Sequence, residues 1–145
     1  MGDCIFCQMA SGARTPHTVY ETDRVLAFLD IHPASRGHTL VIPRAHAERL
    51  DRLSEAEVAP LFLGVKAVMQ LLEKSLRPAG LNVGWNHGWA AGQRVNHLHV
   101  HVIPRYPGDG GGGIQSLTRA WPEAEDLASV AEEIRGESPR LSRDT

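Results

Sequence analysis

The chain has 145 residues, 22% of them charged, and a formal net charge of -2 with its histidines neutral. This length suffices for one domain with a sizeable core, and the charge leaves no basic surface for nucleic acid. No apolar run approaches the ~20 residues that cross a bilayer, and residues 1–6 lack the basic and apolar regions of a secretory signal. We therefore expect a cytoplasmic protein with neither a nucleic-acid nor a membrane partner.

The first third of the chain predicts one short helix and three strands. Ile5 to Ala10 favours a helix that ends before Gly12. The β-rich segments 18–22 and 25–29 are separated by two polar residues, which predicts a hairpin. Residues 39–42 form a short apolar run before Pro43, typical of a buried strand.

A long amphipathic helix is predicted over residues 54–76. It opens on Ser54-Glu55-Ala56-Glu57, which matches a capping box. Apolar residues then follow at helical spacing: Val58, Leu61, Phe62, Val65, Val68, Met69, Leu72 and Leu76. Pro60 lies too deep for the first helical position, so we expect it to kink the helix or shift its start.

The next segments predict a strand at 81–85 and a glycine-rich loop at 86–93. After them comes a strictly alternating stretch, His97-Leu98-His99-Val100-His101-Val102-Ile103. Alternation is the period of a β-strand, so the three histidines should share one face. The other face, made of Leu98, Val100 and Val102, should belong to the core.

The C-terminal part begins with a second glycine-rich loop at 108–113. An amphipathic pattern at 122–135 then predicts a C-terminal helix. Together the elements predict an α+β fold, with a mostly antiparallel sheet, one long helix and this C-terminal helix. We expect one domain over residues 1–136 and a disordered tail at 137–145.

Three interpretations of the histidine row are open from the residues alone. The side chains could lie on a half-exposed surface. They could bind a metal, although His97 and His101 would lie ~13 Å apart along a strand, too far for all three to reach one ion at ~2 Å. They could also act on phosphorus, because neutral imidazole is a nucleophile and an imidazole N–H donates to phosphate oxygens. Glycines in the loop at 86–93 would let backbone N–H groups approach such an anion.

The two cysteines of the chain form one C-x-x-C motif, Cys4 to Cys7. It lies almost at the N-terminus with no strand before it, which argues against a thioredoxin-like redox pair. Two thiols are too few for a closed zinc site, which takes four ligands. If zinc binds here, the remaining ligands come from elsewhere in the chain, and histidine is the type we expect.

The histidine stretch resembles the signature of the histidine triad (HIT) family of nucleotide hydrolases and transferases. Other segments resemble the family at matching separations: Cys4-Ile5-Phe6-Cys7, Phe28-Leu29-Asp30-Ile31, residues 37–46, Gly92-Gln93-Arg94-Val95, and residues 101–105 with Gly108-Asp109. The resemblance covers residues 4–109, and its details are similar to a bacterial zinc-binding branch.

This resemblance implies catalytic roles for three histidines. The middle histidine, His99, would attack the α-phosphorus of a nucleotide and form a nucleotidyl-histidine that water then hydrolyses. His101 would hydrogen-bond the phosphate and assist the leaving group. His38 would support the triad from a neighbouring strand.

The resemblance also implies binding roles. The residues for the substrate would be Asp30 at the ribose hydroxyls, Asn86 and Gln93 near the phosphate, and Phe6, Phe28 and Ile31 around the base. A structural Zn2+ would be held by Cys4, Cys7, His46 and His97. Relatives are homodimers with a sheet that extends across the interface, so we expect a homodimer.

One residue departs from the family pattern, because Arg94 stands where many relatives carry a Ser or Thr that touches phosphate. The expected activity is hydrolysis at the α-phosphate of purine nucleoside phosphoramidates or dinucleoside polyphosphates, most simply with an adenylyl group. Two rivals are a zinc-dependent hydrolase with a metal-activated water and a non-catalytic nucleotide-binding module.

Overall fold

The computed structural model describes residues 2–118 and 126–137. The chain divides into two compact units, Met1–Gly111 and Gly112–Thr145. The first unit contains a five-stranded antiparallel sheet in the order β1-β2-β3-β5-β4, which confirms the predicted α+β class. The single domain over residues 1–136 stays a prediction.

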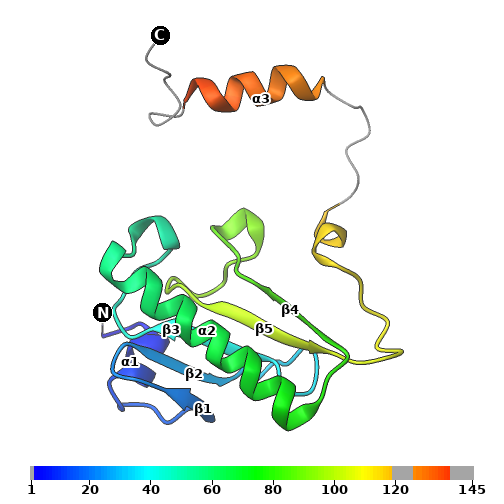
Figure 1. The fold of residues 1–145 in the computed structure, drawn as a ribbon. Helices are drawn as coiled ribbons and strands as arrows, with labels where there is room; N and C mark the ends of the chain where they lie inside the picture. Colours follow the sequence, from blue (N-terminus) through cyan, green and yellow to red (C-terminus); the bar gives the residue numbers. More distant parts are fainter. Residues whose placement is uncertain (1, 119–125, 138–145) are drawn as a thin grey trace. The chain divides into compact units, whose positions relative to one another are not determined.

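In the sheet, the first residues of β3 pair with the first residues of β5 (Figure 1). Its strands are β1 (Thr18–Glu21), β2 (Val25–Leu29), β3 (Thr39–Pro43), β4 (Gly80–Gly84) and β5 (Val100–Arg105). The predicted hairpin is present, because β1 pairs antiparallel with β2. On β5, His101 lies between Leu40 of β3 and Gly84 of β4. His101 is therefore held in the interior of the sheet, and His38 immediately precedes the neighbouring strand.

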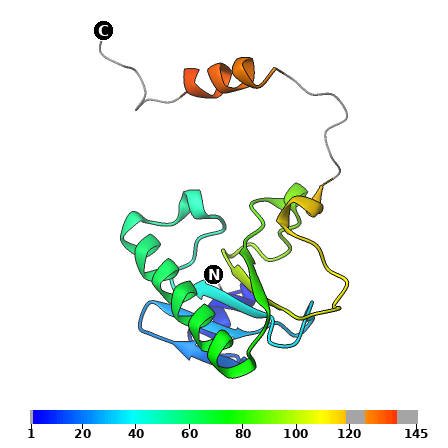
Figure 2. The ribbon, with the colours of Figure 1, turned by 45° about the vertical axis from the view of Figure 1, so that its right-hand side comes forward.

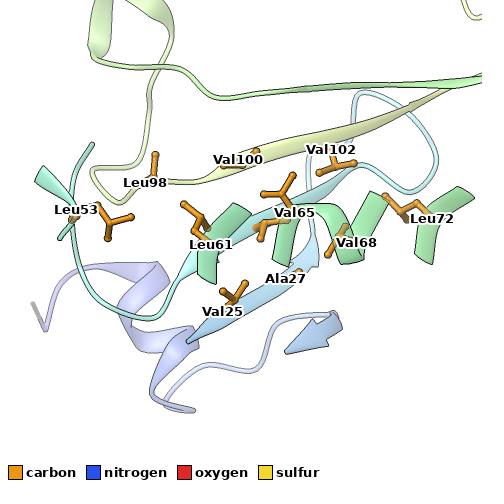
Figure 3. Packing of buried hydrophobic residues seen from close by; sticks show 12 residues of the cluster. Val25, Ala27, Leu53, Leu61, Val65, Val68, Leu72, Leu98, Val100 and Val102 are labelled. Atoms are coloured by element: carbon orange, nitrogen blue, oxygen red, sulfur yellow. The ribbon is translucent and has the colours of Figure 1, made fainter. Parts of the chain in front are cut away.

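Helix α2 (Glu55–Leu76) covers one face of the sheet (Figures 1 and 2). Its apolar stripe packs on alternate residues of the strands, and Figure 3 shows this core. The buried members are Val25, Ala27, Val41, Ala47, Leu53, Leu61, Val65, Val68, Leu72, Leu98, Val100 and Val102. Gly64 lets the helix approach closely, because a Cβ there would lie 2.8 Å from Cγ1 of Val25. The predicted core face of the histidine stretch is confirmed.

The start of α2 differs in detail from the prediction. Ser54 is the N-cap residue, but its side chain makes no capping hydrogen bond, so the predicted capping box is not formed. The Glu57 amide instead donates to the Ser54 carbonyl, at 2.9 Å. The helix begins at Glu55 and runs through Pro60, so the proline does not shift the start.

Helix α1 (Ile5–Ala10) packs on the sheet residues that point away from α2. This second cluster consists of Phe6, Leu26, Phe28, Leu40 and Ile42. Arg44 fastens the end of α1 to the hairpin, since its guanidinium donates to the carbonyl oxygens of Ala10 and Thr22, each at 2.8 Å. The face that carries the histidines is thereby closed on one side by α1.

The predicted strand over residues 97–103 is wrong at its start, because β5 begins only at Val100. The Leu98 amide donates to the Ala47 carbonyl at 2.7 Å, and the His97 carbonyl accepts from a histidine ring. Backbone groups with these partners are not free to continue the sheet ladder. His97 therefore lies in a bend that precedes the strand.

The second unit contains helix α3 (Leu127–Gly136), and the side chain of its N-cap residue, Asp126, accepts from the Ala128 amide. It matches the predicted C-terminal helix from residue 127 onward, and residues 122–125 of that prediction lie outside the described residues. Residues 138–145 of the predicted tail also lie outside them. Within the described part of the chain, no helix has the length and apolarity needed to cross a membrane.

Candidate functional site

The ring of His99 is held by a hydrogen bond to its own backbone. Its Nδ1 lies 2.7 Å from the carbonyl oxygen of His97. A carbonyl only accepts, so Nδ1 carries the proton and Nε2 of the neutral ring carries the lone pair. No described residue forms a hydrogen bond with that Nε2. His99 is thus a buried imidazole with one nitrogen fixed and the other free.

A chain of three hydrogen-bonding groups sets the tautomers of His38 and His101. The Ala34 amide donates to Nδ1 of His38 at 3.0 Å, so the proton of neutral His38 must be on Nε2. That Nε2–H donates to Nδ1 of His101 at 2.9 Å. The proton of neutral His101 is therefore on its own Nε2, which becomes a donor.

Nε2 of His101 is the one buried side-chain nitrogen or oxygen without a partner among the described residues. An unsatisfied buried donor is costly, and such groups are uncommon away from functional sites. The centroids of the His99 and His101 rings lie 5.2 Å apart. The site thus places a free imidazole lone pair on His99 beside an unpaired imidazole N–H on His101, an arrangement suited to a phosphate group.

Burial keeps the rings of His38 and His101 uncharged. It lowers the pKa of His101 to about 4, with help from the neighbouring His99 and His38. Burial also lowers the pKa of His38, and the carboxylate of Asp30 opposes that shift. At neutral pH both rings are uncharged, which is the state that the tautomer assignment requires.

Asp30 lies at the edge of this group. Its Oδ2 is 3.6 Å from Nε2 of His38, and its Oδ1 accepts from the His32 amide at 2.9 Å. Asp30, His38 and His101 lie close enough together to suggest a cation site. However, Nε2 of neutral His38 carries a proton and cannot be a ligand without losing it. The hydrogen-bonded network accounts for this group without a metal.

The apolar residues predicted around a base lie in two environments. Phe6 and Phe28 are buried with their ring centroids 5.4 Å apart, and Phe6 also contacts His99 edge-on at 5.2 Å. Ile31 is 73% exposed. Phe6 therefore joins the core to the face that carries His99, and Ile31 presents an uncovered apolar surface.

The two amides predicted near phosphate are not hydrogen-bonded to the triad in the described structure. The Gln93 side chain is buried, and its NH2 group donates to the carbonyls of Glu48 and Val95 at 2.7 and 3.0 Å. Its Oε1 accepts from the Gly88 amide at 2.9 Å. Asn86 is partly buried against Gly92. In this conformation Gln93 fixes the loop that leads to the triad.

The residues predicted as metal ligands form a second cluster, which we call the donor cluster. It consists of Cys4, Cys7, His46 and His97, whose ligand atoms all lie within 4.8 Å of one another. Nε2 of His97 lies 2.8 Å from the Pro43 carbonyl and donates to it, which leaves the lone pair on Nδ1. That Nδ1 faces both sulfurs, each at 3.5 Å.

The spacing within the donor cluster matches a tetrahedron. Zn–S bonds of ~2.3 Å and Zn–N bonds of ~2.05 Å would separate S from N by ~3.5 Å and N from N by ~3.3 Å. Nδ1 of His46 lies 3.2 Å from Sγ of Cys7 and 3.2 Å from Nδ1 of His97. The four residues therefore fit the tetrahedral coordination of one ion, with no coordination position left for water or substrate.

The donor cluster is adjacent to solvent at one side. A surface hollow of about 760 Å³ is lined by Cys7, His46 and Arg44 among others, and not by His99 or His101. Burial raises the pKa of the Cys7 thiol, and its hydrogen bond with Cys4 adds to the shift. Burial likewise lowers the pKa of His97 to about 4. The neutral forms of both groups are favoured until a cation binds.

Sequence reasoning missed the groups that fix the tautomers. They are the carbonyls of Pro43 and His97 and the amide of Ala34. All three are backbone groups, so no side-chain pattern marks them. The turn at Pro33 and Gly37 was the nearest signal, because it brings Ala34 back toward His38.

Known proteins resemble this chain over most of its length. A family model described as HIT domain matches residues 12–108. The chain is 44% identical to an uncharacterized HIT-like protein, MJ0866 of Methanocaldococcus jannaschii, over 92% of this chain and 99% of that one. A crystal structure of SMU.412c from Streptococcus mutans has a TM-score of 0.83 at 37% identity, covering 94% of this chain and 86% of that one.

Two relatives have names that state an activity. The adenosine 5'-monophosphoramidase hnt1 of Schizosaccharomyces pombe is 38% identical over 90% of this chain and 95% of its own length. The adenylylsulfatase HINT3 of Arabidopsis thaliana is 35% identical over 81% of this chain and 59% of its own length.

The lowered pKa of His101 predicts how the stability of the protein depends on pH. Between the unfolded value near 6.5 and the folded value of about 4, the unfolded chain binds more protons at His101 than the folded one. The contribution of neutral, buried His101 to the free energy of unfolding is fully present above pH 6.5 and is lost as the pH falls toward 4. We expect urea unfolding to show a smaller loss of stability from pH 7 to pH 5 in His101→Gln than in the wild type. His17→Gln, at an exposed histidine, is the matched control, and equal losses in wild type and His101→Gln would contradict the assignment.

Proposed function

The chain belongs to the HIT family, and on that premise we propose that it hydrolyses nucleotides at the α-phosphate with His99 as the nucleophile. Some members of the family are nucleotide hydrolases. The observation that supports the proposal most is the free Nε2 of His99 beside the unpaired Nε2–H of His101. The substrates we propose are purine nucleoside phosphoramidates or dinucleoside polyphosphates, with adenylyl as the simplest group.

The chemistry uses two displacements at phosphorus. The lone pair on Nε2 of His99 attacks the α-phosphorus, and the leaving group departs with the bonding electrons and takes up a proton. The positive charge on the nucleotidyl-imidazole is stabilised by the hydrogen bond from Nδ1 to the His97 carbonyl. Water then attacks phosphorus, releases a proton and regenerates neutral His99.

His101 has a separate task in this scheme. Its Nε2–H donates to an oxygen of the phosphate or to the leaving atom, where negative charge develops. His38 keeps that donor in place, because its own Nε2–H occupies Nδ1 of His101. A donor fixed before substrate arrives needs no reorganisation during the reaction.

We assign nucleoside binding to residues beside the triad. The carboxylate of Asp30 has acceptor capacity left after its bond from the His32 amide, so it can accept from both ribose hydroxyls. Phe6, Phe28 and the exposed Ile31 would contact the base. Asn86 and Gln93 stay proposals for the phosphate region, and Gln93 would act through the loop that it holds.

We propose that the donor cluster binds a structural Zn2+, as in a bacterial zinc-binding branch of the family. Two thiolates and two neutral imidazoles form a closed set of ligands, which supplies fold stability rather than a metal-bound water. The ion would join α1 to the segment that precedes β5. His97 would then fix the backbone carbonyl that holds His99.

We propose a homodimer whose contact includes the free edge of β4. This strand is at the end of the sheet order, so its outer edge is available to a second copy. The rings of Phe62 and Trp85 pack at 5.6 Å, and Leu63 is exposed nearby on α2. A cytoplasmic location without nucleic-acid partners completes the proposal.

Removal of the nucleophile tests the reaction. His99→Asn should lower the turnover of adenosine 5'-phosphoramidate and diadenosine polyphosphates by ~10³-fold or more, because it removes the side chain that forms the proposed intermediate. AMP binding, measured by calorimetry, should persist in the variant. His17→Asn, at an exposed histidine, is the matched control and should keep full activity.

The same experiment separates the rivals. Turnover retained by His99→Asn would rule out His99 as the nucleophile and favour a metal-activated water. AMP binding by the wild type without turnover of any of these substrates would indicate a non-catalytic module.

The zinc proposal predicts a structural effect of metal removal. Atomic emission should find one zinc per chain, and Cys7→Ser should lose it and lower Tm by several degrees, because a closed metal site contributes to folding. The folded fraction of the variant should keep much of its kcat. Cys7→Ser with unchanged Tm, or with activity abolished in a fully folded protein, would contradict a structural role.

A further inference from the structure

Trp89 and Arg94 form an exposed pair on the loop that leads to the triad. Trp89 begins a 3-10 turn, η2 (Trp89–Ala91), and is 81% exposed. Cζ of Arg94 lies 5.9 Å from the centroid of the Trp89 ring. The pair offers a flat aromatic surface and a guanidinium charge at the same place. The chemistry proposed above uses neither side chain.

The loop that carries this pair is anchored to the segment that leads to the triad. The Gln93 amide ties Gly88 to Val95 and anchors both to Glu48. Val95 packs on the apolar cluster that contains Phe6, and the Phe6 ring contacts His99. Arg94 therefore precedes a residue that packs on the cluster of Phe6, and the Phe6 ring in turn contacts His99.

The charge of Arg94 favours an anionic ligand. Arg94 forms no ion pair with any described residue. In the segment to which the loop is anchored, Arg49 and Arg52 both pair with Asp51, at 3.4 and 3.9 Å. The guanidinium of Arg94 is therefore the cation of this loop that is left to pair with an anionic ligand.

We propose that Trp89 and Arg94 form a leaving-group subsite that selects substrates whose leaving group carries further phosphates and a base. This inference rests on the proposed function and narrows its substrate class to dinucleoside polyphosphates. Arg94 would pair with phosphates beyond the α-phosphate, and Trp89 would stack on the second base. The amine of a phosphoramidate offers neither contact.

The subsite acts on the first displacement. The bond from the α-phosphorus to the bridging oxygen breaks as the bond to Nε2 of His99 forms. The electron pair stays on the oxygen of the departing nucleoside polyphosphate, which gains negative charge. Arg94 stabilises that charge as it develops, and the nucleoside monophosphoryl group stays on His99 until water removes it.

The ratio of kcat/KM for diadenosine tetraphosphate to kcat/KM for adenosine 5'-phosphoramidate tests this subsite. Arg94→Gln should lower the ratio about tenfold or more, since it removes a charge-assisted phosphate contact. Trp89→Ala should lower it about fivefold through loss of stacking, and Arg94→Lys should recover part of the loss. Arg24→Gln, at an exposed arginine on the turn between β1 and β2, is the matched control and should keep the wild-type ratio.

Ligand binding to His99→Asn, the variant expected to have little turnover, gives a second and independent test of the subsite. In His99→Asn, diadenosine tetraphosphate should bind more tightly than AMP and quench tryptophan fluorescence. Adding Arg94→Gln to this variant should reduce the difference in affinity between diadenosine tetraphosphate and AMP. Adding Trp89→Phe should reduce the quenching.

The possible results separate this inference from the proposed function. An unchanged ratio in Arg94→Gln, or an equal loss for both substrates, would overturn the subsite while the proposed hydrolysis stands. If the wild type turns over neither substrate, the proposed reaction fails. The affinity difference in His99→Asn then decides the subsite, and its insensitivity to Arg94→Gln would overturn it.

Discussion

The hydrogen bond from Nδ1 of His99 to the carbonyl oxygen of His97 determines what the rest of the site can do. Without it, the ring could carry its proton on either nitrogen, and the lone pair would point at the substrate only part of the time. The acceptor is free because the chain bends at His97 and enters β5 only at Val100. The irregular backbone before the strand is therefore a requirement of the proposed chemistry.

Each of the three alternating histidines is fixed by a different partner. His97 donates to the Pro43 carbonyl and turns its Nδ1 toward the donor cluster. His99 donates to the backbone, and His101 accepts from His38, so their free nitrogens have opposite character. In the proposed mechanism, the three identical side chains would thus serve as a metal ligand, a nucleophile and a hydrogen-bond donor. Burial supports this division, because it lowers the pKa values of His97 and His101 to about 4 and so keeps both rings neutral at physiological pH.

The sequence predicted the parts of the fold that depend on side-chain period. The apolar stripe of α2 and the alternation of Leu98, Val100 and Val102 both correspond to burial against the same core. The start of β5 could not be predicted, because it depends on two hydrogen bonds. The Leu98 amide donates to the Ala47 carbonyl, and the His99 ring donates to the His97 carbonyl. The capping box failed for a similar reason, since the sequence motif does not determine the rotamer of Ser54.

The site was predictable as a set of residues but not as a hydrogen-bonded system. Resemblance to the family singled out His38, Asp30 and the donor cluster. In the structure Asp30 and His38 lie close to His101, and the four members of the donor cluster lie close to one another. The direction of every proton depends on Ala34, Pro43 and His97 backbone atoms, which have no signature in the sequence. Gln93 matches the family pattern in sequence. Its side-chain oxygen and nitrogen, however, are hydrogen-bonded to the backbone of Gly88, Glu48 and Val95.

The most direct measurement of the central claim is the protonation of each imidazole nitrogen by ¹⁵N NMR on protein with ¹⁵N-labelled histidine, near neutral pH. His99→Asn and His101→Asn spectra would assign the signals. We expect His99 to carry its proton on Nδ1 with Nε2 bare, and His101 to carry its proton on Nε2 with Nδ1 bare. A proton on Nε2 of His99, or a bare Nε2 on His101, would contradict the account.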